Sequence, residues 1–568
     1  MAISFEEVRK FLIEKNKITP TTAFADFVKT KAETVGDKVF MTYVRDFDKG
    51  IDEKYTYREM HLQSNRVANG LLNLGITRGD GISLVEINSP EFLFALFGAY
   101  KIGNYVVLVN TGLKGDGLQY IIDHSDSKTI IIHWTLLENY INIKDQLPKV
   151  KHVIVDVNEA PSDYELPEGI LSLQGIMETS DTDTNVEIQP DDMSMLMYTS
   201  GTTGLPKATT SFYRGMIGYG LLGSAFVAYG MGRPGDTFFT CLPLFHGNAL
   251  GLSTMPAYAA EFPLVLSKRF SASRFWNIIR KYGVTNFNLL GSMPQYLMKQ
   301  PERPNDKDHK VWRVNSAACP KELVRAFEER FGLKLYEGYG AVDGAGFNLG
   351  TGGDPNAPVG SMGKPAEGVI AEIMDDDMNI LPPNEVGELV FLVKEEEKAT
   401  RKVTYYKNPE ASVARRQVAP DGRMWFLTGD LATKDENGWF FFVDRKKDSI
   451  RRRGENIAAW SIERVINEHE KVLESAAYGI KGHQVGEDYA EDEIMAAVVL
   501  QPGQTMTAGE LLDYIQDKLA YFQVPRFIDF VDELPKSKVH RIMKRFLKER
   551  GVTENTYDRE KTGYEIKR

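Results

Sequence analysis

The amino-acid sequence predicts an α/β fold, with a large N-terminal domain of layered α/β subdomains plus a β-rich subdomain, and a small α+β C-terminal domain. Short β-branched runs alternate with helical periods through most of the chain, which favours parallel sheets covered by helices. From Gly387 onward the runs alternate as antiparallel strands do, with Asp-Gly and Asn-Gly turns between them. A compact helix and strand pattern closes the chain, whose 568 residues exceed what one ordinary core accommodates.

The elements of the first part follow from composition and spacing. Residues 129–134 (TIIIHW) and 151–157 (KHVIVDV) predict buried strands, and the apolar run 193–197 (MSMLM) predicts a third. Residues 324–332 (VRAFEERFG) predict a helix that closes on a glycine cap. Residues 334–340 (KLYEGYG) predict a strand that leads into a turn.

The β-rich part has its own signals. Residues 387–393 (GELVFLV) and 439–445 (WFFFVDR) predict antiparallel strands. The dipeptides Asp421-Gly422 and Asn437-Gly438 predict tight turns beside them, because these residue pairs tolerate positive φ.

A domain boundary is expected near residues 444–448, which divides the chain into 1–446 and 447–568. Beyond it, residues 461–480 predict a helix followed by a strand, and residues 493–500 predict another strand. Residues 510–522 (ELLDYIQDKLAYF) predict a further helix.

Two apolar stretches are too interrupted to cross a membrane. Residues 92–109 are broken by Lys101 and Asn104, and residues 215–232 by repeated glycines, so both predict buried helices. The N-terminal segment 1–17 is amphipathic and carries Glu6, Glu7 and Glu14, so it does not resemble a signal peptide. We therefore expect no transmembrane segment, while peripheral contact with a membrane stays open.

Charge and cysteine content narrow the function. The chain has 68 Lys and Arg against 79 Asp and Glu, a net charge of −11, so no nucleic-acid partner is expected. The two cysteines, Cys241 and Cys319, cannot build a disulfide framework, which fits a reducing, cytoplasmic location. Residues 536–550 hold seven basic residues and one acid, which indicates either an anionic ligand shared between the domains or a solvated helix face.

The sharpest local signal is the stretch Tyr198–Lys207 (YTSGTTGLPK), directly after an expected strand. Its two glycines let the backbone expose consecutive N–H groups, and its hydroxyls add donors. Lys207 adds a mobile positive charge, so the stretch suits phosphate oxygens. It is not a Walker A loop, because Pro206 precedes the lysine and Ala208 follows it.

Seven segments, taken in order, resemble motifs of the adenylate-forming superfamily, which comprises acyl-CoA synthetases, the adenylation domains of peptide synthetases, and luciferases. The first is Tyr198–Lys207, and the resemblance spans roughly residues 20–550. The segment DRKKDSIRRRGENI is most similar to the carnitine/crotonobetaine–CoA ligase and fatty-acid–CoA ligase branches. The other segments are Leu242–Leu250, Tyr336–Gly344, Gly360–Pro365, Phe426–Asp430, Asp444–Ile457 and Leu534–Arg545.

This resemblance implies an enzyme, an AMP-forming carboxylic acid–CoA ligase. Such an enzyme joins a carboxylate to the α-phosphate of ATP, releases pyrophosphate, and passes the acyl group to the thiol of CoA with release of AMP. ATP, Mg²⁺ and CoA are thus implied, with a fatty or other largely apolar acid as substrate. Residues 1–446 would form the adenylation core with the ATP and carboxylate sites, and residues 447–568 a mobile lid that turns about a hinge at Lys447. A homodimer stays open.

The resemblance also implies the residues that contact ATP. Asp430 suits the ribose, because a carboxylate presents two acceptors to two neighbouring hydroxyls. The implied set is Thr199, Ser200, Gly201, Thr202, Thr203, Gly204 and Lys207 at the β- and γ-phosphates, Ala318, Gly338, Tyr339, Gly340, Ala341 and Val342 beside the nucleotide, Asp430 at the ribose, and Arg445 at the ribose or the phosphates.

Two departures from the family pattern stand out. Val342-Asp343 replaces the usual Thr-Glu, so a hydroxyl that reaches the α-phosphate is missing, while Asp343 keeps an oxygen ligand for Mg²⁺. Arg541 replaces the lysine that bridges the carboxylate and the α-phosphate, and its guanidinium can still bind oxyanions. We expect Arg541 to take that role, with Lys538 or Lys544 as alternatives.

The remaining implied residues line the thiol and acid sites. Gly454 would line the CoA tunnel, and Arg451, Arg452 and Arg453 would contact CoA phosphates or belong to a surface basic run. With Lys207 and Arg541, His246 completes the predicted catalytic set, as a lid or wall beside the carboxylate. The expected acyl pocket comprises Phe245, Gly247, Asn248, Leu289 and Gly291.

The sequence supports three other functions less well than the ligase function. A nucleotide-binding pseudoenzyme or regulator with weakened adenylation is the alternative, motivated by Val342, Asp343 and Arg541. A luciferase-like monooxygenase would keep the same motifs, and only an assay for light or oxygen use separates it. We expect no peptide-synthetase module, because no carrier domain follows residue 568.

Overall fold

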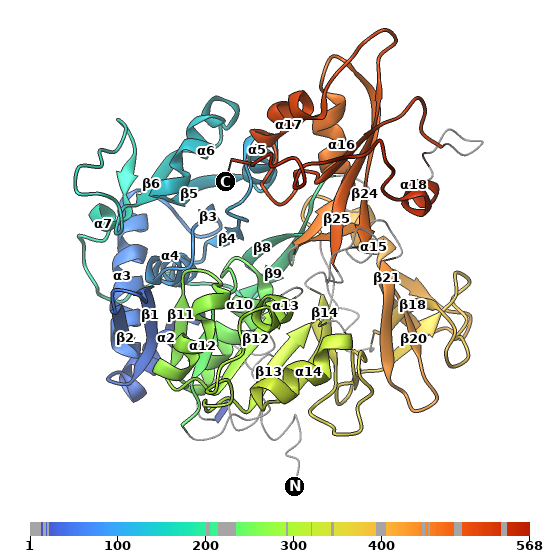
Figure 1. The fold of residues 1–568 in the computed structure, drawn as a ribbon. Coiled ribbons are helices and arrows are strands. Elements are labelled where there is room, and N and C mark those ends of the chain that lie inside the picture. Colours follow the sequence, from blue (N-terminus) through green and yellow to red (C-terminus); the bar gives the residue numbers. More distant parts are fainter. Residues whose placement is uncertain are drawn as a thin grey trace.

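A computed structural model shows a large lobe, made of the described residues up to Arg445, and a small lobe, made of those from Ser449 onward (Figure 1). The α/β fold with a β-rich part and a small α+β part is confirmed. The structure describes residues 13–14, 19, 22–199, 205–213, 235–290, 293–317, 319, 321–341, 346–393, 405–445, 449–452, 455–481, 491–535, 542 and 544–567.

The first sheet of the large lobe has the strand order β7-β6-β5-β3-β4-β8-β9 over the described residues. All its neighbours are parallel except β9, which pairs antiparallel with β8. The strands predicted at 129–134, 151–157 and 193–197 are confirmed as β5, β6 and β8. The bounds are β3 (Gly81–Val85), β4 (Tyr105–Leu108), β5 (Ser127–His133), β6 (His152–Asp156), β7 (Leu171–Ser172), β8 (Met193–Thr199) and β9 (Lys207–Phe212).

The second sheet has the order β16-β15-β14-β13-β12-β10-β11-β1-β2 among the described strands. It is parallel from β14 to β1, while β2, β15 and β16 are antiparallel edges. The bounds are β1 (Val39–Asp46), β2 (Ile51–Thr56), β10 (Phe238–Thr240), β11 (Leu264–Ser267), β12 (Asn286–Leu290), β13 (Arg313–Ala317), β14 (Leu335–Ala341), β15 (Gly346–Gly350) and β16 (Lys364–Pro365).

The strand predicted at residues 334–340 is confirmed as β14, and the turn predicted after it falls on residues 342–345, which lie outside the described residues. β14 continues to Ala341, with Gly338 opposite Gly350 and a register irregularity after Tyr339. Because a bulge accommodates glycine within a strand, the two glycines do not end the element.

Helices cover both sheets. Every residue of α4 (Pro90–Lys101) is buried, which confirms a buried helix for the first part of 92–109, whereas the second part forms β4. The helix predicted at 324–332 is confirmed as α14, and Gly332 beyond it has φ +65°. The other helices of the large lobe include α2 (Phe24–Val35), α3 (Tyr57–Asn73), α5 (Gly115–His124), α6 (Leu137–Ile141), α7 (Leu173–Ile176), α10 (Gly247–Ala249), α11 (Met255–Ala260), α12 (Ala272–Lys281), α13 (Met293–Met298) and α14 (Lys321–Phe331), with a π-helical turn at Leu250–Thr254.

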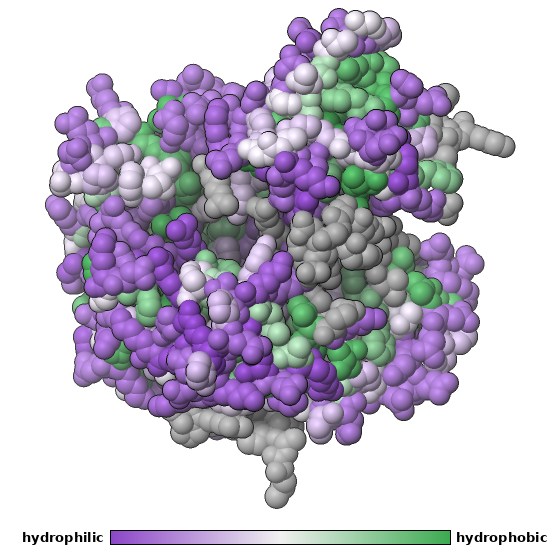
Figure 2. All heavy atoms as spheres, in the orientation of Figure 1, coloured by the Kyte–Doolittle hydropathy of each residue, from purple (hydrophilic) through white to green (hydrophobic). Residues whose placement is uncertain are grey.

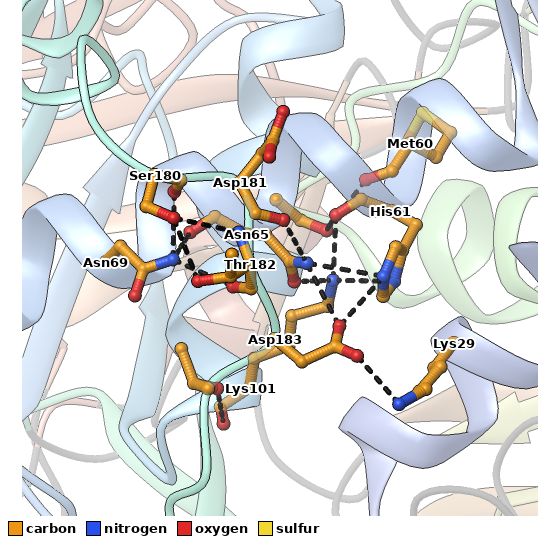
Figure 3. Close-up of polar contacts among 12 residues, drawn as sticks. Lys29, Met60, His61, Asn65, Asn69, Lys101, Ser180, Asp181, Thr182 and Asp183 are labelled. Carbon is orange, nitrogen blue, oxygen red and sulfur yellow. Dashed lines mark hydrogen bonds and ion pairs between the residues drawn. The ribbon is translucent and has the colours of Figure 1, made fainter.

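A buried polar cluster fixes α3 and α4 to residues 180–183 (Figure 3). Lys101 Nζ donates to the carbonyl of His61 at 2.9 Å and to Asn65 Oδ1 at 2.6 Å. Asp183 accepts from Asn65 Nδ2 at 3.1 Å and pairs with Lys29 at 2.8 Å. Burial lowers the pKa of Lys101 to about 7, opposed by the charge of Asp183.

The β-rich part is antiparallel, as predicted. Gly422 and Gly438 have φ of +81° and +78°, which confirms the two predicted turns. Its elements are β17 (Ala371–Met374), β18 (Gly387–Leu392), α15 (Pro409–Ala414), β19 (Arg416–Val418), β20 (Met424–Lys434) and β21 (Phe440–Arg445).

The small lobe has its own apolar clusters, one on each side of β24 and β25. The helix predicted at 510–522 is shorter than expected, because α17 ends at Gln516. The elements are β22 (Ser449–Arg452), β23 (Glu455–Ala458), α16 (Ala459–Asn467), β24 (Val472–Lys481), β25 (Asp492–Leu500), α17 (Ala508–Gln516), β26 (Phe527–Phe530), α18 (Lys544–Arg550) and β27 (Tyr557–Asp558).

The visible surface is mainly hydrophilic, with hydrophobic atoms in scattered patches (Figure 2). No helix in the described parts of the chain is long and apolar enough to span a membrane. Residues 215–232, predicted as a buried helix, lie outside the described residues. Cys241 and Cys319 are both buried, and neither forms a disulfide.

Candidate active site

The predicted phosphate stretch joins β8 to β9 at the carboxyl edge of the first sheet, near the centre of the molecule (Figure 1). Thr199 ends β8 and pairs in register with Lys207, which begins β9. Lys207 Nζ lies 5.4 Å from the centroid of the Tyr405 ring. Parallel strands point their carboxyl ends at one edge, which is where such sheets bind ligands. Residues 200–204 lie outside the described residues.

Helix α5 braces the two strands that carry this stretch. The hydroxyl of Tyr120 donates to the carbonyl of Pro206 at 3.1 Å. His124 Nδ1 lies 2.8 Å from the hydroxyl of Tyr198. These contacts fix Tyr198 and Pro206, which flank residues 200–204, to a helix that covers the same sheet.

Tyr339 and Asp430, both predicted to contact the nucleotide, are brought together from different sheets. The Tyr339 hydroxyl donates to Asp430 Oδ2 at 2.5 Å, and its ring stacks on Phe391 at 6.4 Å between centroids. Asp430 is only 5% exposed, and its backbone N–H donates to Thr428 Oγ1 at 3.1 Å. Arg445 lies opposite Asp430 in the β20–β21 register. The arrangement presents a buried, oriented carboxylate beside an aromatic ring, which suits a nucleoside.

A row of amides runs along the predicted acid site. Asn288 Nδ2 donates to Asn248 Oδ1 at 2.7 Å, and Asn315 Nδ2 donates to Asn288 Oδ1 at 3.0 Å. Arg313 Nε donates to Asn315 Oδ1 at 3.1 Å. Leu289, on the same strand as Asn288, is completely buried. The predicted pocket residue Asn248 is therefore the end of an ordered polar row that sequence reasoning did not include.

His246 links the two lobes. Its Nε2 lies 3.0 Å from Glu455 Oε1, at the start of β23 in the small lobe. Burial lowers the pKa of His246, but the charge of Glu455 and its hydrogen bond outweigh burial and raise it overall. Phe245, which is 7% exposed, packs its ring 4.7 Å from the imidazole, and Gly247 begins α10. Glu455 was not among the residues predicted from the sequence, although a single acidic residue directly after Arg-Arg-Arg-Gly could have marked it as a candidate for a polar contact.

Two further contacts hold the lobes in this arrangement. Arg464 Nη1 lies 3.1 Å from Asp116 Oδ2. A Cβ placed on Gly112 would lie 2.7 Å from the ring of Phe522, so the two lobes meet closely at this glycine. The small lobe is thus seated on the large lobe through several contacts on different elements.

Three basic residues of the small lobe form ion pairs with acidic residues of the same lobe. Arg452 is 1% exposed and pairs with Glu493 at 2.9 Å, so the expectation that it contacts CoA phosphates or lies on the surface is wrong. Lys544 pairs with Glu463 at 2.7 Å, and Arg550 pairs with Asp529 of β26. Both belong to α18, which Figure 1 draws at the outer side of the small lobe. In this arrangement both residues are paired within the small lobe, and the shared-ligand interpretation of 536–550 stays a prediction.

Some of the remaining predicted site residues lie in β14, and others lie outside the described residues. Gly338 is buried and Gly340 is exposed in β14, and Ala341 ends that strand. The predictions that lie outside the described residues are Ser200, Gly201, Thr202, Thr203, Gly204, Gly291, Ala318, Val342, Asp343, Lys447, Arg453, Gly454, Lys538 and Arg541.

Comparisons with known families match most of the chain. Residues 28–393 match the AMP-binding enzyme family, and residues 461–541 match the AMP-binding enzyme C-terminal domain. The crotonobetaine/carnitine–CoA ligase of Salmonella paratyphi A is 31% identical over 526 residues, which cover 91% of this chain and 97% of that protein. The enzyme of the same name from Salmonella typhi is 30% identical and covers 90% and 96%.

Solved structures share the fold. The o-succinylbenzoate CoA synthetase of Bacillus subtilis superimposes with a TM-score of 0.75 and 23% identity, covering 92% of this chain and 98% of that one. The amide bond synthetase of Marinactinospora thermotolerans gives a TM-score of 0.75 with 22% identity, covering 94% and 100%. The match extends over both lobes in each case.

Proposed function

Since this chain belongs to the family of AMP-binding enzymes and is an AMP-forming ligase, we propose that it activates a carboxylic acid with ATP and transfers the acyl group to coenzyme A. The observation that carries the proposal is the contact between Tyr339 and Asp430, which prepares a nucleoside site near the phosphate stretch. Two anions must meet in the first step, so the barrier is largely electrostatic.

The proposed ATP site uses cations and oriented donors. Lys207 and the backbone of residues 199–204 bind the β- and γ-phosphates, and Asp430 accepts the ribose hydroxyls. Arg541 bridges the carboxylate and the α-phosphate, which lowers their repulsion as the acyl-adenylate forms. Bound Mg²⁺ would neutralise part of the triphosphate charge, and the carboxylate of Asp343 is the hard oxygen ligand that it prefers.

We interpret the lobe arrangement as the one used for transfer to the thiol. Glu455 follows Gly454 directly and lies against His246, so the proposed CoA tunnel segment is held beside the proposed carboxylate site. Adenylation would need the small lobe to turn about Lys447 and bring Arg541 in. The two lobes would thus act as an adenylation core at residues 1–446 and a lid at residues 447–568. Separately, we propose a cytoplasmic location.

For the acid we propose a fatty or other largely apolar compound, because Phe245 and Leu289 are buried apolar residues at the expected pocket. The relatives named for crotonobetaine and carnitine make a trimethylammonium acid the main competitor. A panel of fatty, aromatic, alicyclic and betaine acids, each with ATP, Mg²⁺ and CoA, separates them by kcat/KM.

The test measures AMP release as a function of acid and CoA together. The proposal expects release that requires both, and loss of activity in Lys207→Met. Lys54→Met is the matched control, because Lys54 is exposed on the edge strand β2 and should leave the rate unchanged. ATP binding without AMP release for any acid would instead support a nucleotide-binding regulator.

A further inference from the structure

Three buried side chains meet at the carboxyl edge of the first sheet, away from β8. β6, β5 and β3 are consecutive parallel strands, and His133 and Asp156 are the last residues of β5 and β6 and lie in register. Glu86 directly follows β3. One ligand atom from each of the three residues lies within 4.8 Å of the others, and the residues are only 1%, 4% and 2% exposed in the order Glu86, His133, Asp156.

Each of the three side chains uses one polar atom for a neighbour. Glu86 Oε1 accepts from the backbone N–H of Ile87 at 2.9 Å. Asp156 Oδ1 accepts from Gln174 Nε2 at 2.7 Å and from the N–H of Asn158 at 2.9 Å. These contacts orient the carboxylates as neighbours orient the ligands of known metal sites.

The histidine is oriented in the same way. His133 Nδ1 lies 2.7 Å from Thr135 Oγ1. The backbone N–H of Thr135 also donates to Nδ1 at 3.4 Å, so Nδ1 is the nitrogen held by neighbours, and a metal at Nε2 would take the place of a proton. The side-chain geometry therefore leaves one imidazole nitrogen for a ligand.

Glu86 supplies the observation that points to a missing partner. Its Oε2 atom is buried and has no hydrogen-bond partner in the described part of the chain. An unpaired buried carboxylate oxygen is costly, so native structures rarely keep one. A cation at the cluster would satisfy it.

The charges around the cluster favour a cation. Nearby Glu159 pairs with both Arg45 and Lys268. In contrast, no ion pair among the described residues involves Glu86 or Asp156. Two buried carboxylates that lack a basic partner are usually protonated or bound to a metal.

A cavity of about 500 Å³ lies next to residues that contact the cluster. Its lining includes Glu91, Asn158, Gln174 and Glu178. Gln174 is the residue that donates to Asp156, and Asn158 Nδ2 donates to Glu91 Oε1 at 2.7 Å. Two residues of the cavity wall, Asn158 and Gln174, therefore also donate to Asp156, while the three cluster residues themselves lie behind the wall.

We propose that Glu86, His133 and Asp156 bind a divalent transition-metal ion, with Zn²⁺ the best match to one imidazole and two carboxylates. Zn²⁺ takes imidazole and carboxylate ligands at about 2.0–2.2 Å, so the side chains would close on the ion, with water in a fourth position. Strand β4 separates β3 from β8, so this site is distinct from the proposed Mg²⁺ and ATP site.

The ion would stiffen a segment that supports the acid site. Two residues beyond Glu86, Asn88 Nδ2 donates to the carbonyl of Leu242 at 2.9 Å, and Asn88 Oδ1 accepts from the N–H of Leu244 at 2.8 Å. Leu244 precedes Phe245 and His246. The site is thus structural, with an effect on the position of the acid pocket rather than on the reacting atoms.

The test uses the full chain, stripped with a chelator and then titrated with Zn²⁺ alone, with excess Mg²⁺ in parallel. We expect one Zn²⁺ per chain, not displaced by Mg²⁺. Glu86→Gln and His133→Gln should each weaken binding by more than about 10-fold, since even outer-layer changes cost that much. Glu178→Gln is the matched control, because Glu178 lines the same cavity but is outside the cluster, and it should bind as the parent does.

A second measurement needs no variant. Crystals or solutions loaded with Co²⁺ or Zn²⁺ should give an anomalous peak or a Co²⁺ absorption band of a low-coordinate site at these three residues. Clearly substoichiometric zinc, binding that survives both substitutions, or a metal peak elsewhere would overturn the proposal. None of these results depends on ligase activity, so the metal site and the proposed function fail separately.

Discussion

Replacing Asp430 with alanine should weaken ATP binding by about 1–3 kcal/mol, which corresponds to a rise of about 5–150-fold in Kd. The carboxylate is 5% exposed and held by its own backbone contact to Thr428, so it is oriented before ATP binds. This loss of binding free energy corresponds to the loss of hydrogen bonds from two ribose hydroxyls to a charged acceptor. It stays moderate because one oxygen already accepts from Tyr339 in the ligand-free protein.

Tyr339→Phe separates the hydroxyl from the ring. The ring keeps its stacking on Phe391, while Asp430 loses one donor and can accept a ribose hydroxyl in its place. We expect a change in ATP affinity below about 1 kcal/mol, and almost no further change when Tyr339→Phe is added to Asp430→Ala. Asp430→Asn, which keeps the shape and one acceptor, should lie between the parent and Asp430→Ala.

Calorimetric titration of ATP into the acid-free protein measures these affinities, with thermal unfolding as a control for folding. Unchanged ATP affinity in a folded Asp430→Ala protein would refute the ribose contact. Fully additive effects in the double variant would refute the coupling between Asp430 and Tyr339.

Three other substitutions test the lobes and the buried lysine. Arg541→Ala should suppress adenylation but spare transfer from preformed acyl-adenylate, and equal loss of both half-reactions would contradict its role. Gly112→Ala places a methyl group against Phe522, so it should slow thiol transfer more than adenylation, and equal rates would argue against the transfer arrangement. Lys101 has a pKa of about 7 when folded, below its unfolded value of about 10.4, so the unfolded chain binds more protons between these pH values. The free energy of unfolding should therefore rise by up to about 1.4 kcal/mol per pH unit across this window, and urea unfolding of Lys101→Met should lose that slope.

Local sequence patterns predicted the elements that depend on neighbouring residues. The β-branched runs at 129–134 and 151–157 became β5 and β6, because a parallel sheet buried on both faces selects such runs. Local sequence patterns did not predict where some elements end. Strand β14 continues through Gly338, although glycine often ends a strand, and helix α17 ends at Gln516, before the helical spacing of apolar residues ends. In both places pairing or packing, rather than propensity, sets the end of the element.

Contacts between distant segments could not be predicted from residue patterns alone. His246 and Glu455 are 209 residues apart, and their contact depends on how the lobes sit. Glu86, His133 and Asp156 are single polar residues at three strand ends, and only the strand order β6-β5-β3 brings them together. A search for polar residues directly after buried parallel strands would have found this cluster.

The central claim is that this chain forms an acyl-adenylate from ATP and a carboxylic acid. Its most direct test is the exchange of radiolabelled pyrophosphate into ATP, with Mg²⁺ present and CoA absent. The account predicts exchange that requires an acid and is strongly reduced in Lys207→Met and Arg541→Ala. No exchange with any acid of the panel, while ATP still binds, would contradict it.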